Sequence, residues 1–156
     1  MLYIKDREKI VKEATEWLNT PYKCWSKCKH FGCDCLGLIA GVFVACGFIT
    51  AKQADAAIPK GYSLQIGQHQ ADTAYIDGLL TFTEEIQEHE AGPGDVVMYQ
   101  IDLAFSHSAI VIQWPMIIHA LAHGGVRFAD GTKHPLLAGK PRRFFTLQDK
   151  YCAGGR

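Results

Sequence analysis

The chain has 156 residues, of which 16 are basic and 16 acidic, so its formal net charge is zero. This balance and the lack of a basic block argue against partners held by charge, such as nucleic acid or an anionic membrane surface. The length of 156 residues fits one domain spanning 1–156, and the sequence has no apolar run long enough for a transmembrane helix.

The N-terminal part of the chain has the apolar spacing of helices. Residues 6–19 predict an amphipathic helix, capped by Asp6 and ending before Pro21. A loop rich in Cys, Lys and Gly is expected over residues 20–34. The next helix, over residues 35–46, is apolar on all sides, which predicts that it lies buried at the centre of the domain.

The middle of the chain has weaker patterns. Residues 47–65 read as a loop with a short helical turn near Ala54, and residues 66–81 fit a helix. Residues 83–88 predict a short edge strand. The Gly and Pro residues of 91–95 then predict a turn.

From this turn onward the pattern changes to short β-type runs. Gly or Pro lies between most of the runs, as in a meandering antiparallel sheet. Helices first and a sheet second predict a domain of the α+β class. The expected strands are 95–101, 107–113, 116–121, 126–128 and 143–146.

Cys35 lies where the buried helix is expected to begin. Asp34 can cap this helix, its carboxylate accepting a backbone N–H of the first turn. The helix dipole favours an anion there, which predicts a Cys35 thiol pKa below the free value of about 8.5 and rapid alkylation. Cys46 is expected to react slowly and Cys152, near the C-terminus, as an unactivated thiol. Cys35 is therefore the candidate nucleophile, with helix N–H groups available for an oxyanion.

A cysteine nucleophile needs a base and a group that orients the base. His107 begins one expected strand and His119 lies in the next, 12 residues further on (119 − 107), with a turn at Trp114-Pro115. Antiparallel pairing can hold the two imidazoles side by side, one as the base and the other as its orienting partner. Alone, Cys35 would be interpreted as a core residue and each histidine as structural, so the combination carries the hypothesis.

A metal site is the main chemical alternative. Cys24, Cys28, Cys33 and Cys35 lie close together with His30, but their intervals lack the two separated pairs of structural zinc sites. The N-terminus lacks the apolar core of a signal peptide, so synthesis in the reducing cytoplasm, with free thiols and no bound metal, is expected. The remaining histidines are expected at the surface: His30, His69, His89, His123 and His134.

Short motifs follow one another along the chain in a recognisable order. The central one is Gly32-Cys33-Asp34-Cys35-Leu36-Gly37-Leu38, which resembles the Asp-Cys-Ser-Gly-Leu signature of the NlpC-type, papain-like cell-wall cysteine peptidases. Its Cys-Asp-Cys form, with the Tyr62 region and Thr83–Ile86, resembles the branch encoded by phages, prophages and gene transfer agents. The other similar segments are Thr20-Pro21-Tyr22, Gly92–Val97, His107–Val111, Ile118-His119-Ala120 and Lys140–Phe144.

The resemblance implies a role for each site residue. Cys35 would be the nucleophile, His107 the general base and His119 the orienting residue. Tyr22 would help to hold the oxyanion, and Asp34 would bind the free amine of a stem peptide. The implied substrate is peptidoglycan, cleaved without a cofactor at the amide bond between γ-D-glutamate and a diamino acid.

The phage-type resemblance also implies partners and a location. Phage tail proteins would be partners, and the enzyme would reach the cell wall in a phage particle, after lysis or by export. Neither nucleic acid nor membrane insertion is implied.

The chain departs from the family pattern at three places. Leu36 replaces the usual serine, the loop from Tyr22 to Cys35 is one residue longer, and residues 48–90 are longer than in compact members. Three other functions stay open: an amidase or acyl transferase on the same fold, a non-catalytic phage tail assembly protein, and a zinc-stabilised binding module.

Overall fold

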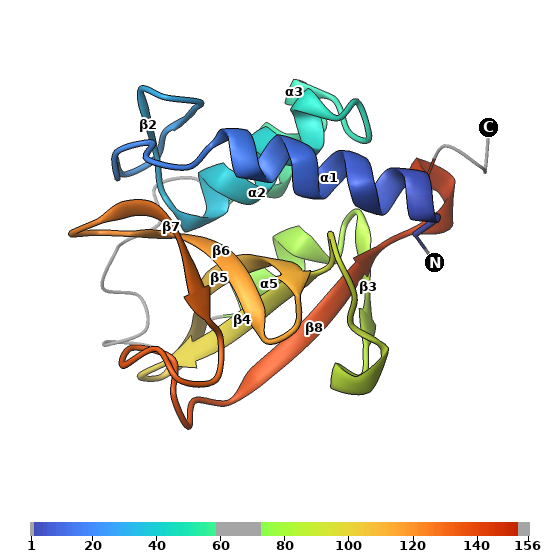
Figure 1. Ribbon diagram of the computed structural model, residues 1–156. Coiled ribbons are helices and arrows are strands. Elements are labelled where there is room, and N and C mark those ends of the chain that lie inside the picture. Colours follow the sequence, from blue (N-terminus) through green and yellow to red (C-terminus); the bar gives the residue numbers. More distant parts are fainter. Residues whose placement is uncertain (1, 59–72, 153–156) are drawn as a thin grey trace.

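The computed structural model describes residues 2–58 and 73–152, in which helices pack on one antiparallel sheet (Figure 1). The predicted α+β class, with N-terminal helices and a C-terminal sheet, is confirmed. Parts of the expected loop and helix over residues 47–81, together with Tyr62 and His69, lie outside the described residues. The helices are α1 (Ile4–Glu16), α2 (Cys35–Ala45), α3 (Ala51–Ala57) and α5 (Ala74–Leu79). The strands are β1 (Lys27–Cys28), β2 (Gly32–Cys33), β3 (Thr83–Ile86), β4 (Val96–Ile101), β5 (Ala104–Gln113), β6 (Met116–Leu121), β7 (Gly125–Asp130) and β8 (Arg142–Leu147).

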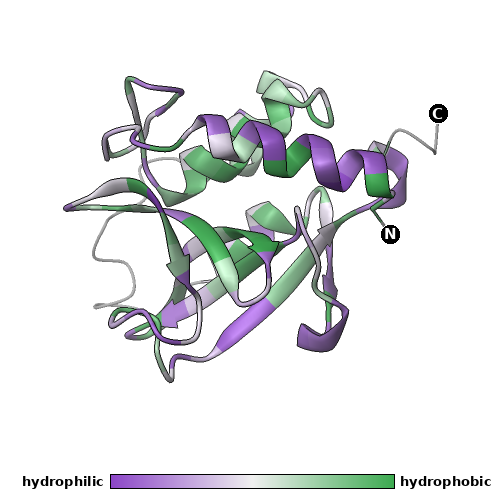
Figure 2. Ribbon diagram, in the orientation of Figure 1, coloured by the Kyte–Doolittle hydropathy of each residue, from purple (hydrophilic) through white to green (hydrophobic). Residues whose placement is uncertain are grey.

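Helix α1 begins earlier than predicted, and Asp6 is not its cap. Tyr3 occupies the N-cap position without a side-chain hydrogen bond, and Asp6 lies buried in the first turn. The helix alternates polar and apolar residues (Figure 2) and buries Ile10 and Ala14. Its end depends on Asn19, whose left-handed φ of 68° turns the chain before Pro21.

The segment expected to be a loop over 20–34 contains a small antiparallel hairpin, β1–β2. Lys27 pairs with Cys33 and Cys28 with Gly32. The Ser26 hydroxyl also donates a hydrogen bond of 2.8 Å to the Gly32 carbonyl. Two-residue strands carry too little alternation to be recognised from a sequence. This hairpin brings the chain directly to the start of α2.

Helix α2 is the buried helix that the sequence predicts. Asp34 is its N-cap, and its Oδ1 accepts the Gly37 N–H at 2.7 Å, as expected. The helix is almost wholly apolar (Figure 2) and packs between α1 and the sheet. Gly41 permits the closest contact with α1, since a Cβ there would lie 2.2 Å from the ring of Trp17.

Two short helices pack near α2. The predicted helical turn near Ala54 is a full helix, α3, because Thr50 and Gln53 form a capping box at its start. Helix α5 is shorter than the predicted 66–81 in the part of the chain that the structure describes. Gly78 lies against α3, where a Cβ would meet the Ala57 carbonyl oxygen at 1.9 Å. The absence of a side chain at Gly78 therefore allows the two helices to touch.

The six-stranded sheet has the order β3-β8-β4-β5-β6-β7, with antiparallel neighbours throughout. Strands β4 to β7 form the predicted meander. Strand β8 departs from it, because it returns across the sheet and lies between β3 and β4 (Figure 1). The edge strand expected over 83–88 is β3, which pairs only with β8 among the described strands.

Strand β5 is bulged next to one of the candidate histidines. It begins at Ala104, so His107 is its fourth residue rather than its first as predicted. His107 pairs with Tyr99, but the next pair is Phe105 with Gln100, which leaves Ser106 as the extra residue. Bulges bend a strand and re-aim the side chains beside them.

Candidate active site

Cys35 is the first residue of α2, as predicted, and it is tied to strand β5 by two contacts. Its thiol Sγ lies 3.6 Å from the carbonyl oxygen of Ser106, the bulge residue. The Ser108 hydroxyl donates a 3.0 Å hydrogen bond to the carbonyl oxygen of Cys35. The helix start and the bulged strand are therefore fixed relative to each other. Neither serine was recognised from the sequence, because their partners lie more than 70 residues away in the chain.

His107 and His119 lie side by side, as the sequence predicted. Nε2 of His107 is 2.9 Å from Nδ1 of His119, and the two rings are nearly perpendicular at 81°. His119 is completely buried and His107 is only 9% exposed. The contact leaves Nδ1 as the ring nitrogen of His107 that is open to a further partner.

One cavity of about 180 Å³ joins the thiol to the histidine pair, since both Cys35 and His107 line it. Among the described residues, no hydrogen bond connects the Cys35 thiol to the His107 ring, and the thiol contacts Ser106 instead. The expected pairing of the two therefore stays a prediction. The other lining residues are Tyr22, Asp34, Tyr75, Ile101, Ser106, Ala120, Leu121, Ala122 and Leu136.

Tyr22 and Asp34, the remaining candidates, also line this cavity. Tyr22 is half-buried, and its backbone forms an isolated β-bridge with Cys33. Burial and the nearby Cys35 and Asp34 raise the pKa of Tyr22, so its hydroxyl keeps its proton. Both Asp34 oxygens have backbone partners: Oδ1 accepts from Gly37 and Oδ2 accepts the Trp25 N–H at 2.7 Å. Asp34 thus shapes the helix start as well as the cavity wall.

The predicted low pKa of the Cys35 thiol is wrong for this structure. Cys35 is a partly exposed residue, but burial of its thiol and the negative charge of Asp34 together raise its pKa to about 11. Hydrogen bonds from Ser108 and the Leu36 backbone offset only part of this rise. Desolvation of a thiolate outweighs the helix dipole here, and among the described residues the charged side chain that acts on the sulfur is the anionic Asp34.

The histidine pair is likewise uncharged at rest. Burial, together with the proximity of His119 and His134, lowers the pKa of His107 to about 3. Burial and His134 lower the pKa of His119 to about 4. The free site therefore holds a neutral thiol and neutral imidazoles at pH 7 rather than a thiolate–imidazolium pair.

His134 is a site residue that sequence analysis missed. It was expected at the surface, but its ring packs perpendicular to that of His119, with centroids 5.2 Å apart. It is only partly exposed, whereas His30, His89 and His123 are exposed as predicted. The turn that carries His134 folds back over the sheet, which no local pattern in the sequence indicates.

The other cysteines also differ in exposure. All six are free, and Cys28 is exposed. Cys46 is buried near the end of α2, but Cys152 is also fully buried, so the prediction that it reacts as an unactivated thiol is wrong. Burial raises the Cys152 pKa. Within the described residues, no group of three or more His, Cys, Asp or Glu side chains is placed to hold a metal ion.

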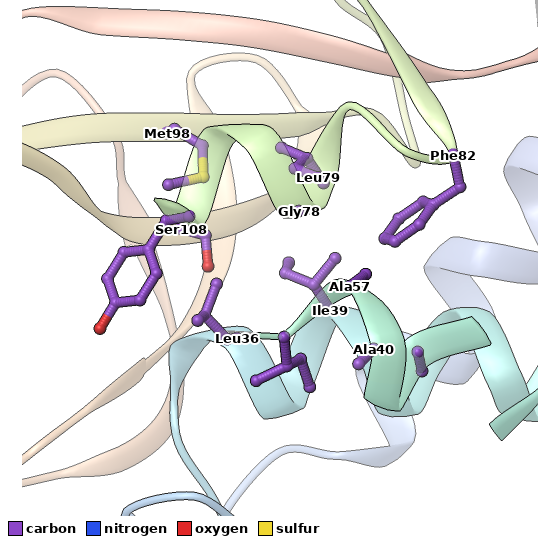
Figure 3. Close-up of a pocket in the computed structure, with 12 residues that line it drawn as sticks. Leu36, Ile39, Ala40, Ala57, Gly78, Leu79, Phe82, Met98 and Ser108 are labelled. Carbon is purple, nitrogen blue, oxygen red and sulfur yellow. The ribbon is translucent and has the colours of Figure 1, made fainter. Parts of the chain in front are cut away.

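A second, apolar cavity lies between α2, α3, α5 and the sheet (Figure 3). Leu36, the residue that replaces the family serine, lines it with Met98 and Ser108. Its volume of about 30 Å³ has room for one or two water molecules at most. Leu36 therefore serves packing beside the nucleophile rather than a substrate site.

A cysteine at the start of a buried helix, facing histidines on an antiparallel sheet, is the arrangement of a papain-like protein. The family model described as NlpC/P60 family matches residues 19–137. The chain belongs to the NlpC/P60 family. None of the described helices has the length and apolar character needed to span a membrane.

Solved structures share this fold at low sequence identity. The NlpC/p60 domain of the peptidoglycan hydrolase SagA has a TM-score of 0.59 at 18% identity, over 91% of this chain and 98% of that one. The peptidoglycan hydrolase RipB from Mycobacterium tuberculosis has a TM-score of 0.58 at 18% identity, over 91% and 65%. NlpC1 from Trichomonas vaginalis has a TM-score of 0.58 at 15% identity, and this chain covers only 44% of its length. A search of curated protein sequences finds no match.

Proposed function

We propose that this chain is a cysteine hydrolase that cleaves amide bonds in the stem peptides of peptidoglycan. Cys35 is the nucleophile, His107 the general base and His119 the residue that orients the base. The observation that supports the proposal most is the shared cavity, which has the thiol on its wall beside a histidine pair joined at 2.9 Å.

The neutral resting site implies proton transfer during attack. As the Cys35 sulfur bonds to the substrate carbonyl carbon, its proton moves to Nδ1 of His107, and the carbonyl oxygen becomes an oxyanion. Tyr22 and the first residue of α2 line the cavity, and the protonated Tyr22 hydroxyl and the helix N-terminus would stabilise that oxyanion. The imidazolium that forms donates its hydrogen to His119, which holds the ring in place.

The second half of the reaction reverses these proton movements. The amine leaves with the proton from His107, which leaves a thioester on Cys35. Water then loses a proton to His107, attacks the thioester and releases a carboxylic acid and the thiol. Each step needs the same imidazole in two protonation states, which the 2.9 Å contact with His119 allows.

The choice of peptidoglycan is supported by chemistry and by relatives. SagA and RipB, which share the fold, are described as peptidoglycan hydrolases. Asp34 contributes a carboxylate to the cavity wall, where it would attract the free amine of a stem peptide. We propose the bond between γ-D-glutamate and a diamino acid as the one cleaved.

Digestion of purified peptidoglycan followed by mass analysis of the fragments tests this function. The wild-type chain should release fragments with a new γ-D-glutamyl carboxyl end. Cys35→Ala should release none, while Cys28→Ala, which removes an exposed thiol elsewhere, should digest normally. Absence of any new fragment from folded wild-type protein would overturn the proposal and leave an amidase, an acyl transferase or a non-catalytic assembly protein.

A second reaction on the same site is favoured by the lining of the cavity. Its lining includes the apolar residues Ile101, Leu121 and Leu136, which suits an amide or thioester with an apolar acyl group. An amidase or acyl transferase would leave peptidoglycan intact but transfer such a group to water or to an added amine. Mass analysis of a mixture of acyl amides with the enzyme separates the two activities.

The phage-type motif supports a place for the chain in a phage particle or a related particle. The chain would then be made in the cytoplasm and reach the wall with tail proteins. Mass spectrometry of purified particles from the source bacterium tests this, and detection only in particle-free lysate would contradict it.

A further inference from the structure

His119 carries a buried ring nitrogen that no described residue satisfies. Its Nδ1 contacts His107, but its Nε2 has no hydrogen-bond partner although the side chain is completely buried. A buried polar group of this kind needs an explanation, since a donor without an acceptor is costly. The ring of His134 packs against that of His119, with ring centroids 5.2 Å apart.

The role proposed for His107 determines where the protons of the pair must be. To take a proton at Nδ1, neutral His107 must carry its own proton on Nε2 and donate it to Nδ1 of His119. Neutral His119 then carries its proton on Nε2, the buried nitrogen without a partner. The opposite arrangement puts a proton on Nδ1 of His107, where it can no longer act as a base. The fold must therefore favour an N–H at Nε2 of His119.

The ring of His134 is held where it can favour an N–H at Nε2 of His119. Its plane is at 89° to that of His119, so the edge of one ring meets the face of the other. Its Nδ1 accepts the Leu136 N–H at 3.2 Å, which restrains the ring. Asp130 orders the start of the turn by accepting two backbone N–H bonds, from Thr132 and Lys133. An aromatic face accepts an N–H weakly, where no other acceptor is present.

We propose that His134 is a positioning residue that receives the Nε2–H of His119 on its ring face and so selects the tautomer in which His107 can act as a base. The inference rests on the proposed catalytic roles of Cys35 and His107. The proposed role depends on the aromatic face of His134 and not on its charge. His134 is therefore not proposed as a second acid or base.

Two substitutions of similar size separate an aromatic role from a packing role. His134→Phe keeps the ring face, whereas His134→Leu fills the space without one. His123→Ala changes an exposed histidine in the neighbouring turn and serves as the control. Thermal unfolding of each variant checks that the fold is retained.

Nitrogen NMR of the histidine side chains in the free protein reports the tautomers directly. In the wild type, in His134→Phe and in His123→Ala, His119 should be protonated on Nε2 and unprotonated on Nδ1. In His134→Leu the preference for that tautomer should fall by about two- to fivefold, the size expected for a weak N–H contact with a ring. The proposal is overturned if the Leu variant keeps the wild-type tautomer, or if wild-type His119 is protonated on Nδ1.

The spectra need no substrate, so their outcome does not depend on whether peptidoglycan is cleaved. If the chain proves inactive on every amide but the tautomers shift as expected, the proposed function fails and the positioning role of His134 stands. If hydrolysis is found and the tautomers do not shift, only the inference about His134 fails.

Discussion

The start of α2 depends on one buried carboxylate, and replacing it should destabilise the protein measurably. Asp34 is 2% exposed and accepts two backbone N–H bonds of 2.7 Å, from Gly37 and from Trp25. Asp34→Ala removes both acceptors. Loss of an ordinary helix N-cap costs about 1 kcal/mol, but the Gly37 N–H is buried, and a buried N–H left without a partner costs about 1–3 kcal/mol. We expect the free energy of unfolding to fall by about 3 kcal/mol.

Urea and thermal unfolding measure this loss. For a chain of this size, about 3 kcal/mol corresponds to a fall in Tm of about 6–12 °C. Asp34→Asn, which keeps one acceptor oxygen, should lose about half as much. Thr50→Ala is the matched control, because Thr50 caps α3 with the same kind of hydrogen bond but is exposed to water. It should cost no more than about 1 kcal/mol.

The comparison of the two caps decides whether burial matters. If Asp34→Ala loses less than about 1 kcal/mol, similar to Thr50→Ala, water reaches the freed N–H groups and the helix start is not desolvated. The same result would weaken the explanation of the raised Cys35 pKa, because that explanation relies on the desolvation of the adjacent residue.

Three further predictions follow from the packing and the charges. Because burial raises the Cys35 pKa to about 11, the rate at which iodoacetamide labels Cys35 in the free protein should still rise between pH 8 and 10. This rate should stay below that of the exposed Cys28. A plateau near pH 7 would indicate a thiolate–imidazolium pair instead. The pKa of His107 falls from 6.5 to about 3 on burial, so the unfolded chain binds a proton that the folded chain does not, and the urea midpoint should drop as pH falls from about 6.5 to 5. His107→Gln should reduce that pH dependence, and the remainder comes from His119, whose pKa is lowered from 6.5 to about 4. Gly41→Ala places a Cβ 2.2 Å from the Trp17 ring and should lower the free energy of unfolding by about 1–3 kcal/mol, as measured by thermal unfolding. At a helix position with space for a Cβ, the same change from glycine to alanine would stabilise the protein.

Features that depend on neighbouring residues were predictable from the sequence. The Asp34 cap, the all-apolar helix after it and the strand pairs around Trp114-Pro115 each depend on a few adjacent positions. Predicting the histidine pair required one further inference, that β5 and β6 pair as antiparallel strands. Where local signals are weak the prediction failed, as at Asp6, which is buried in the first turn of α1 instead of capping it.

Features that depend on distant residues were not predictable. Strand β8 enters the sheet between β3 and β4, although the meander before it suggests an edge position. His134 reaches His119 only because its turn folds over the sheet. The predicted low pKa of Cys35 failed for a related reason: the helix dipole is visible in the sequence, but the burial that raises the pKa of this partly exposed residue depends on the fold.

The bulge at Ser106 accounts for the way the two halves of the site meet. Along β5 the side chains alternate, so Ser108 faces α2 while His107 projects to the face that carries Tyr99. A regular strand would therefore separate His107 from a thiol at the start of α2. The extra residue bends β5 one position before His107 and turns the Ser106 carbonyl towards the Cys35 sulfur. The Cys35 and His107 side chains then border one cavity at the start of α2, which is the arrangement that the proposed Cys–His reaction needs.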